Sequence, residues 1–240
     1  MALKFCPNCG KQNTFGSNFC SNCGTNLQDK SNQEFEIVDG VLKKYNGKNP
    51  VIRVPNSVRK ISGSAFPSSN PIFGFYSSIE KIYLPSSVKE LADGAFSGLT
   101  ALTYVDMPSS LEVIGSYAFK EDYSLEEITI PGKVTEIKSE TFNHCLNLKK
   151  VNLPEGIQVI EGEAFRACVK MTSIRLPRSV KRVGSNIFFD TPIRDIYYSG
   201  TKQEFKNVFS YRVIFYYDYS RPVTVHCSDG TFEFKREEEI

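Results

Sequence analysis

The chain has 240 residues and a formal net charge of +2, and charged residues make up 23% of it. This near-neutral balance argues against the strongly basic surface with which proteins grip nucleic acid or anionic membranes. Only two histidines, His144 and His226, are present, which leaves little room for histidine-based metalloenzymes or hydrolases. The seven cysteines are an odd number, so a disulfide framework cannot pair all of them.

No signal peptide is visible before the first cysteines, and no run of about 18 apolar residues predicts a membrane-spanning helix. Reduced cysteines and the lack of a targeting segment predict a cytoplasmic location.

Four of the cysteines form two C-x-x-C pairs near the N-terminus, Cys6 with Cys9 and Cys20 with Cys23, ten residues apart. A glycine follows each pair and tolerates the positive φ that a tight turn around a metal can require. Two such turns joined by a short hairpin complete a tetrahedral site of four sulfur ligands.

Residues 4–27, with the motifs FCPNCGK and FCSNCG, resemble small bacterial zinc ribbons. The resemblance implies one zinc ion bound by Cys6, Cys9, Cys20 and Cys23, structural because its shell is closed. A rubredoxin-like iron site or two disulfides remain alternatives. Lys4 and Lys11 are the only cations before the linker, so the ribbon is predicted to be a structural or protein-contact module rather than one that binds nucleic acid.

A polar linker follows, and the chain then becomes repetitive. An apolar residue followed by proline recurs six times, with the prolines 30, 23, 23, 23 and 23 residues apart, and a phenylalanine follows each with the same intervals. A fixed period in two independent markers predicts a solenoid. The prolines are Pro55, Pro85, Pro108, Pro131, Pro154 and Pro177, and the phenylalanines are Phe66, Phe96, Phe119, Phe142, Phe165 and Phe188.

The apolar positions inside one unit predict its shape. Ile128 and Ile130 alternate with a period of two, as in a strand with one buried face, and Pro131 ends that strand because it lacks a donor. Val134 and Ile137 begin a second short extended side, and the Ala-Phe step of each unit predicts a short helix or turn. Because one unit cannot bury its apolar edge alone, we expect the units to stack strand on strand.

The pattern L-x-x-I-x-L-P-x-x-V-x-x-I-x-x-x-A-F-x-x-C resembles the BspA-type (Treponema-type) leucine-rich repeat over residues 35–205. Cys145 and Cys168 match the family's cysteine position, and Leu99, Asp122 and Thr191 replace it in other units. The resemblance implies a mainly β leucine-rich-repeat solenoid with short helices or turns, and a general role in adhesion or recognition. Members are often surface-associated, so a surface location stays open beside the cytoplasmic one.

Both ends of the repeats resemble caps. Residues 35–45 predict a hairpin with an Asp39-Gly40 turn, and residues 223–234 predict a second hairpin. The predicted domains are a zinc ribbon (1–27), a linker (28–34), the solenoid with its N-terminal cap (35–205) and a C-terminal β cap and tail (206–240).

No catalytic constellation stands out, and we expect the protein not to be an enzyme. His144 and Cys145 are neighbours in an extended segment, as are His226 and Cys227, so each pair points to opposite faces. Cys145 and Cys168, one repeat apart, are expected to be small buried groups. No phosphate-binding loop, dinucleotide fingerprint or nucleophile elbow is present.

The outward residues of the first strands vary from unit to unit. Such variation is expected of a binding face, and it is equally expected of a surface under no selection. The predicted partner contacts on this face are Lys81, Tyr83, Tyr104 and Asp106, because exposed aromatics favour interfaces. An insertion in the first interval carries Phe73 and Phe75, which would either cover the solenoid or contact a partner.

Taken together, the features predict a scaffold that binds an unidentified protein partner and carries one structural zinc ion. The alternatives are a nucleic-acid-associated regulator acting through the ribbon and a surface adhesion or recognition protein.

Overall fold

The computed structural model describes residues 4–6, 11–14, 16–22, 24, 27, 34–63, 65–67, 77–210 and 222–235. Within these ranges the chain is mainly β, with one helix, α1 (Lys202–Val208). No helix of the described segments has the length and apolar character needed to cross a membrane.

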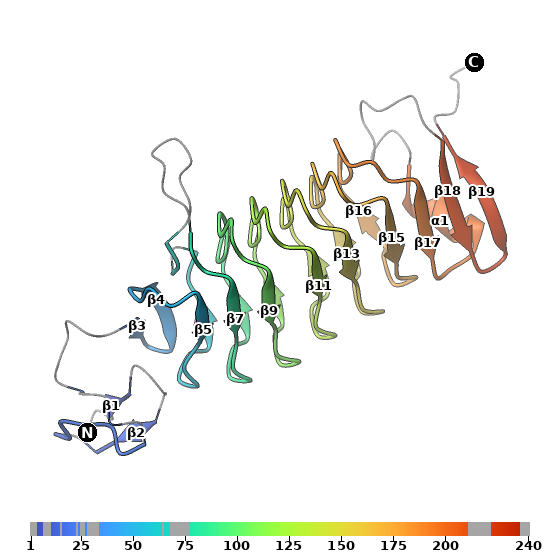
Figure 1. Cartoon of the computed structure of the whole chain (residues 1–240). Coiled ribbons are helices and arrows are strands. Elements are labelled where there is room, and N and C mark those ends of the chain that lie inside the picture. The colour runs from blue at the N-terminus through green and yellow to red at the C-terminus, as the bar shows by residue number, and fades with distance from the viewer. Residues whose placement is uncertain are drawn as a thin grey trace.

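A solenoid of stacked rungs runs from the N-terminal cap to the C-terminal cap (Figure 1). Each of the first six rungs contributes one strand to a first side, one to a second side and then a turn, as the repeat predicts, and the last rung contributes a first strand alone. The first strands are β5 (Val51–Arg53), β7 (Lys81–Tyr83), β9 (Tyr104–Asp106), β11 (Glu127–Thr129), β13 (Lys150–Asn152), β15 (Ser173–Leu176) and β17 (Asp195–Tyr198). The second strands are β6 (Lys60–Ile61), β8 (Glu90–Leu91), β10 (Val113–Ile114), β12 (Glu136–Ile137), β14 (Val159–Ile160) and β16 (Arg182–Val183).

A ladder of phenylalanines fills the interior behind the turns. Phe66, Phe96, Phe119, Phe142, Phe165 and Phe188 are all buried, and neighbouring ring centroids lie between 5.4 and 5.8 Å apart. Tyr45 of the N-terminal cap continues the ladder, with its ring 6.0 Å from that of Phe66. Aromatic pairs at such distances contribute about 0.5–1.5 kcal/mol each beyond the burial of their area.

The turns are also joined by main-chain hydrogen bonds. Between the third and fourth rungs, Tyr117, Phe119 and Glu121 each donate an N–H to a carbonyl of the next turn, at 2.9 Å. In each turn from residue 94 onward two residues have positive φ, here Tyr117 (58°) and Glu121 (64°), and Gly94 and Gly98 hold these positions one rung earlier. The Ala-Phe step is therefore a turn rather than a helix, and its hydrogen bonds offset the cost of left-handed backbone, about 1–2 kcal/mol per non-glycine residue.

The family's cysteine position forms a second buried ladder, as predicted from the sequence. The Cys145 thiol donates to the carbonyl oxygen of Phe119 at 3.0 Å, and the Cys168 thiol donates to that of Phe142 at 3.2 Å. In the next rung the Thr191 hydroxyl donates to the Phe165 carbonyl at 2.5 Å. Each donor lies 26 residues after its acceptor, so one geometry repeats from rung to rung.

Asp122 holds the same position but bonds differently. Its Oδ1 accepts the Leu99 N–H at 2.8 Å, whereas its buried Oδ2 has no hydrogen-bond partner. Burial raises the pKa of the Asp122 carboxyl well above its ordinary value, although the hydrogen bond from Leu99 lowers it.

Both predicted cap hairpins are confirmed. β3 (Phe35–Val38) and β4 (Val41–Tyr45) are antiparallel, with positive φ at Asp39 and Gly40, and β4 pairs in parallel with β6. At the other end β18 (Val223–Cys227) pairs with β17 and, antiparallel, with β19 (Gly230–Phe234). The caps therefore cover the ends of the stacked core.

Helix α1 lies just before the C-terminal hairpin. A capping box between Thr201 and Glu204 begins the helix, and its buried Phe205 packs on Tyr198, Phe209 and Phe234. This helix was not predicted at its position, because a segment of seven residues carries too little helical periodicity.

Candidate protein-interaction site

The outward side chains of β5, β7, β9, β11, β13, β15 and β17 form what we call the first-strand face. The parallel register places Arg53, Tyr83 and Asp106 over one another, and Lys81 beside Tyr104. The Tyr83 and Tyr104 rings lie 5.7 Å apart, and the Arg53 guanidinium lies 4.3 Å from the Tyr83 ring centroid. Four of the six predicted partner contacts are therefore neighbours, and Tyr104 is 46% exposed.

Some charged groups of the first-strand face form ion pairs within the chain. The Lys150 ammonium lies 2.8 Å from a Glu127 carboxylate oxygen, and this contact, with a hydrogen bond from Asn152, lowers the pKa of Glu127. Near the C-terminal cap the His226 ring stacks on Tyr197 at 4.5 Å and its Nε2 lies 2.8 Å from Asp195. Within the described part of the chain, neither the Lys81 ammonium nor the Asp106 carboxylate has an ion-pair partner.

Both sides of the solenoid are interrupted between the third and fourth rungs, a break that we call the seam. The first side has one sheet of β5, β7 and β9 and a separate sheet that begins with β11, and on the second side β10 and β12 also belong to different sheets. In the described residues the Glu126 N–H does not reach the Thr103 carbonyl, although the equivalent bonds from Thr103 to Glu80 and from Lys149 to Glu126 are 2.9 and 2.8 Å.

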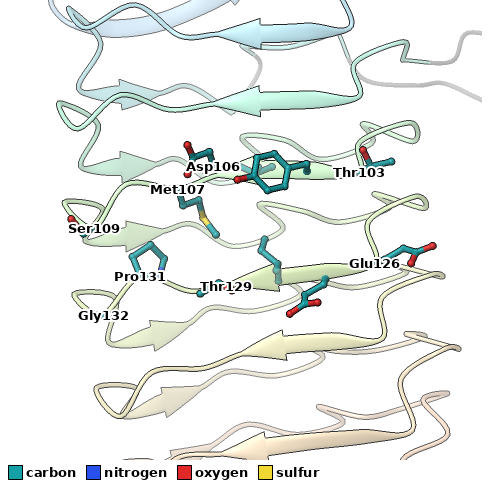
Figure 2. Close-up of a pocket in the computed structure, with 12 residues that line it drawn as sticks. Thr103, Asp106, Met107, Ser109, Glu126, Thr129, Pro131 and Gly132 are labelled. Carbon is teal, nitrogen blue, oxygen red and sulfur yellow. The ribbon is translucent and has the colours of Figure 1, made fainter.

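A groove of about 580 Å³ opens at the seam, between β9 and β11. Thr103 and Glu126 lie at one end of the groove, Ser109, Pro131 and Gly132 lie at the other, and the Met107 side chain extends into the gap (Figure 2). Tyr104, Val105, Asp106, Glu127, Ile128 and Thr129 complete its lining. The groove therefore begins within the predicted contact cluster.

The N-terminal segment is a second candidate site. β1 (Lys4–Phe5) and β2 (Gln12–Asn13) form a short antiparallel hairpin. Cys6 and Cys20 are buried, and the Cys20 Sγ accepts hydrogen bonds from the Asn22 N–H at 3.4 Å and the Asn13 side-chain amide at 3.7 Å. Gly24 has a φ of 72°, as its place after a C-x-x-C pair predicts. Buried sulfur that accepts N–H groups suits a metal-bound thiolate.

Several predicted residues lie outside the described part of the chain: Cys9, Cys23, Phe73 and Phe75. Within the described residues no three potential metal ligands gather, and these residues include only Cys6 and Cys20 of the predicted set.

In neither sequence pair, His144–Cys145 or His226–Cys227, do the described contacts join the histidine to the cysteine. Cys145 is fully buried, which raises the pKa of its thiol well above the ordinary value, whereas the His144 Nδ1 lies against the side-chain oxygen of Asn143. His226 contacts Asp195 on the first-strand face, and burial raises the pKa of the half-buried Cys227 thiol. Raised thiol pKa values oppose the thiolate form that a nucleophile needs.

The stacked rungs, the two strand sides and the buried ladders define a leucine-rich-repeat solenoid. The model of the BspA type leucine rich repeat region matches residues 69–194 in six copies, and a zinc-ribbon domain matches residues 3–27. The chain belongs to the BspA-type leucine-rich-repeat family and carries a zinc-ribbon domain at its N-terminus.

Solved structures agree with this fold. A leucine-rich-repeat protein of T. pallidum is 27% identical, with a TM-score of 0.59 over 69% of this chain and 79% of its own. A leucine-rich-repeat protein of Eubacterium ventriosum is 23% identical, with a TM-score of 0.53 over 65% of this chain. This chain spans about half the length of the second protein, 47%. No functionally curated protein gives a significant match.

The sequence did not reveal the groove. Val105 and Met107 are half-buried, whereas the equivalent residues of the neighbouring rungs are buried. These are Ile82 and Leu84 one rung earlier and Ile128 and Ile130 one rung later, and all of them are apolar and fit the repeat equally well. The sequence signal that was available is the Pro131-Gly132-Lys133 turn, because four of the five other units have a serine in place of Gly132 or Lys133.

Proposed function

We propose that this protein is a non-enzymatic interaction scaffold whose first-strand face binds a protein partner. The observation that carries the proposal is the pair of the half-buried Tyr83 and the exposed Tyr104 beside two charged groups, Lys81 and Asp106, that have no ion-pair partner in the described residues. Aromatic side chains on a rigid stack lose little entropy on binding, and they are enriched among the residues that dominate binding energy.

The role of the ribbon is part of the same proposal. We propose that Cys6, Cys9, Cys20 and Cys23 hold one structural zinc ion in a ribbon over residues 1–27, joined by a linker (28–34) to the solenoid (35–205) and its C-terminal cap and tail (206–240). The buried Cys6 and Cys20 and the N–H groups directed at the Cys20 sulfur support this set of ligands. The ion would stabilise a segment too small to fold by apolar burial.

A comparative pull-down tests the face. Wild-type protein, the Tyr83→Ala/Tyr104→Ala variant and a Tyr117→Ala control would capture partners from the same lysate. Tyr117 is a matched control because it is 40% exposed and lies on the turn side, where Ala167 adopts a similar positive φ. We expect partners that wild type and the control retain to be lost from the double variant. Equal recovery by all three proteins would exclude the first-strand face.

Metal analysis tests the ribbon. We expect about one zinc per chain in the wild type and a loss of bound zinc in Cys9→Ser and Cys23→Ser variants. A Cys168→Ser variant, altered in the buried ladder of the solenoid, should keep its zinc. Iron in place of zinc, or zinc that persists in both ribbon variants, would contradict the proposed ligand set.

A further inference from the structure

The seam separates two halves of the strand surface while the turns hold the halves together. The sheets on both sides end there, yet three main-chain hydrogen bonds of 2.9 Å and the stacked Phe119–Phe142 pair still join the third and fourth turns. A second interruption, between β13 and β15, affects the first side alone, because β14 and β16 remain paired. The β9–β11 groove therefore lies at the one rung interface of the described solenoid where both sheets are open.

The charged side chains that line the groove are all acidic. Asp106, Glu126 and Glu127 provide three carboxylates, and the carbonyls of Thr103 and Thr129 face the gap that strand pairing would otherwise close. Glu126 and Glu127 are already paired with Lys149 and Lys150 at 2.8 Å, whereas the Asp106 carboxylate has no ion-pair partner in the described residues. An occupant that brings positive charge and hydrogen-bond donors would therefore meet, at Asp106, a carboxylate that the described chain leaves without a counter-charge.

Two other tyrosines of the first-strand face are each covered by an arginine of the chain itself. Arg53 lies 4.3 Å from the Tyr83 ring centroid, and Arg175 lies 4.8 Å from that of Tyr197. In each case the arginine comes from the rung before. Tyr104 stands in register with Lys81 rather than with an arginine, and no cation lies over its ring in the described residues. The chain thus supplies a guanidinium to two of its face tyrosines and leaves the exposed Tyr104 without one.

We propose that the β9–β11 groove binds an arginine side chain of an extended basic segment of a protein partner. The guanidinium stacks on Tyr104 and donates hydrogen bonds to the Asp106 carboxylate, while the stem packs on Met107. A guanidinium suits this site better than an ammonium does, because its planar fork of five donors can serve a ring face and a carboxylate together. The inference rests on the proposed function, because it specifies the chemistry of the partner at the same face.

Fluorescence anisotropy with synthetic peptides tests the proposal. The probe is fluorescein-labelled GSRTRTRSG, and the matched peptides replace every arginine with lysine or with citrulline, the neutral analogue of arginine. With the full chain in low salt, we expect binding of the arginine peptide, weaker binding of the lysine peptide and about 10-fold or greater loss for citrulline. Equal affinity for the arginine and citrulline peptides, or binding of none of the peptides, would overturn the proposal.

Variants of the groove and a matched control test whether the arginine peptide binds at Asp106 and Tyr104. Asp106→Asn and Tyr104→Leu should each weaken the arginine peptide about 10-fold, whereas Tyr104→Phe, which keeps the ring, should stay close to wild type. Glu112→Gln removes the same charge from an exposed residue at the start of the second side, next to β10, and should have little effect. Equal losses in Asp106→Asn and Glu112→Gln would show unspecific attraction and refute the groove.

The pull-down separates this inference from the proposed function. If the Tyr83→Ala/Tyr104→Ala variant loses its partners while the arginine peptide fails to bind, the face stands and arginine recognition is refuted. If the double variant keeps every partner while the arginine peptide binds the wild type at Asp106, the groove recognises arginine, but the proposed function of the face and the groove's role in binding a partner are refuted.

Discussion

The buried carboxyl of Asp122 allows a quantitative test of the ladder at the cysteine position. Its Oδ2 has no partner, and burial raises its pKa well above the ordinary value. Thr191 shows how a hydroxyl satisfies the same site, because its Oγ1 accepts the Cys168 N–H at 3.1 Å and donates to the Phe165 carbonyl at 2.5 Å. We therefore predict that Asp122→Thr stabilises the protein at neutral pH.

The expected gain in stability is estimated from the cost of the Asp122 Oδ2, which has no hydrogen-bond partner. A buried polar group without a partner costs about 1–3 kcal/mol, and a threonine at position 122 can accept from Leu99 and donate to the Phe96 carbonyl 26 residues earlier. We expect the free energy of unfolding at pH 7 to rise by about 1–3 kcal/mol. For a chain of this length that corresponds to an increase in Tm of roughly 2–12 °C.

The raised pKa of Asp122 also predicts how the stability difference between the variant and wild type changes with pH. Since the folded state raises the pKa of Asp122, it favours the protonated carboxyl, and this group's contribution to stability is greatest below its unfolded pKa of about 3.9. The contribution is lost as pH rises from there toward the folded pKa. Threonine does not titrate, so the advantage of Asp122→Thr over wild type should grow with pH across that window.

Urea unfolding at several pH values between 4.5 and 8 measures both effects. Asp106→Thr is the matched control, because Asp106 is exposed, and its effect should stay within about 0.5 kcal/mol. A variant less stable than wild type at pH 7, or an advantage that does not grow with pH, would refute the reasoning from the unsatisfied Oδ2 and the raised pKa of Asp122.

Three further predictions concern other parts of the molecule. Phe142→Ala should lower the free energy of unfolding by about 3–5 kcal/mol, because the ring is fully buried and stacked on both neighbours; a loss below about 1 kcal/mol in urea titration would contradict a continuous ladder. Cys145 and Cys168 should react with a thiol reagent at pH 8 only after unfolding, since burial raises both pKa values, and rapid labelling of folded protein would disprove this. Asn13→Ala should weaken zinc binding about 10–100-fold in chelator competition, whereas Thr14→Ala should not; equal affinities would remove Asn13 from the support of the Cys20 sulfur.

Much of the fold was open to prediction because it is repetitive. The apolar side chains of a 23-residue repeat are buried when equivalent residues of successive units lie over one another. This stacking places Lys81 beside Tyr104 and Tyr83 beside Asp106. The Asp39-Gly40 turn was equally clear, because a two-residue hairpin needs positive φ at both positions.

The interior of the turns was less predictable. Tyr117, Glu121 and their equivalents adopt positive φ although few of them are glycine, because main-chain bonds to the next rung hold them there. Such bonds depend on the neighbouring unit and leave no local sequence signal. Helix α1 was missed for a related reason, since packing of Phe205 on the cap hairpin stabilises seven residues that would not be helical alone.

The sequence by itself determined the repeat, the rows of the first-strand face, the caps and the burial of Cys145 and Cys168, because each follows from local periodicity or turn chemistry. Only the tertiary structure decided that the strands separate between β9 and β11 and that Asp106 stays without an ion-pair partner in the described residues. The physical reason is that a ladder closes or opens according to how two whole rungs pack. Val105 and Met107 satisfy the repeat pattern in either case.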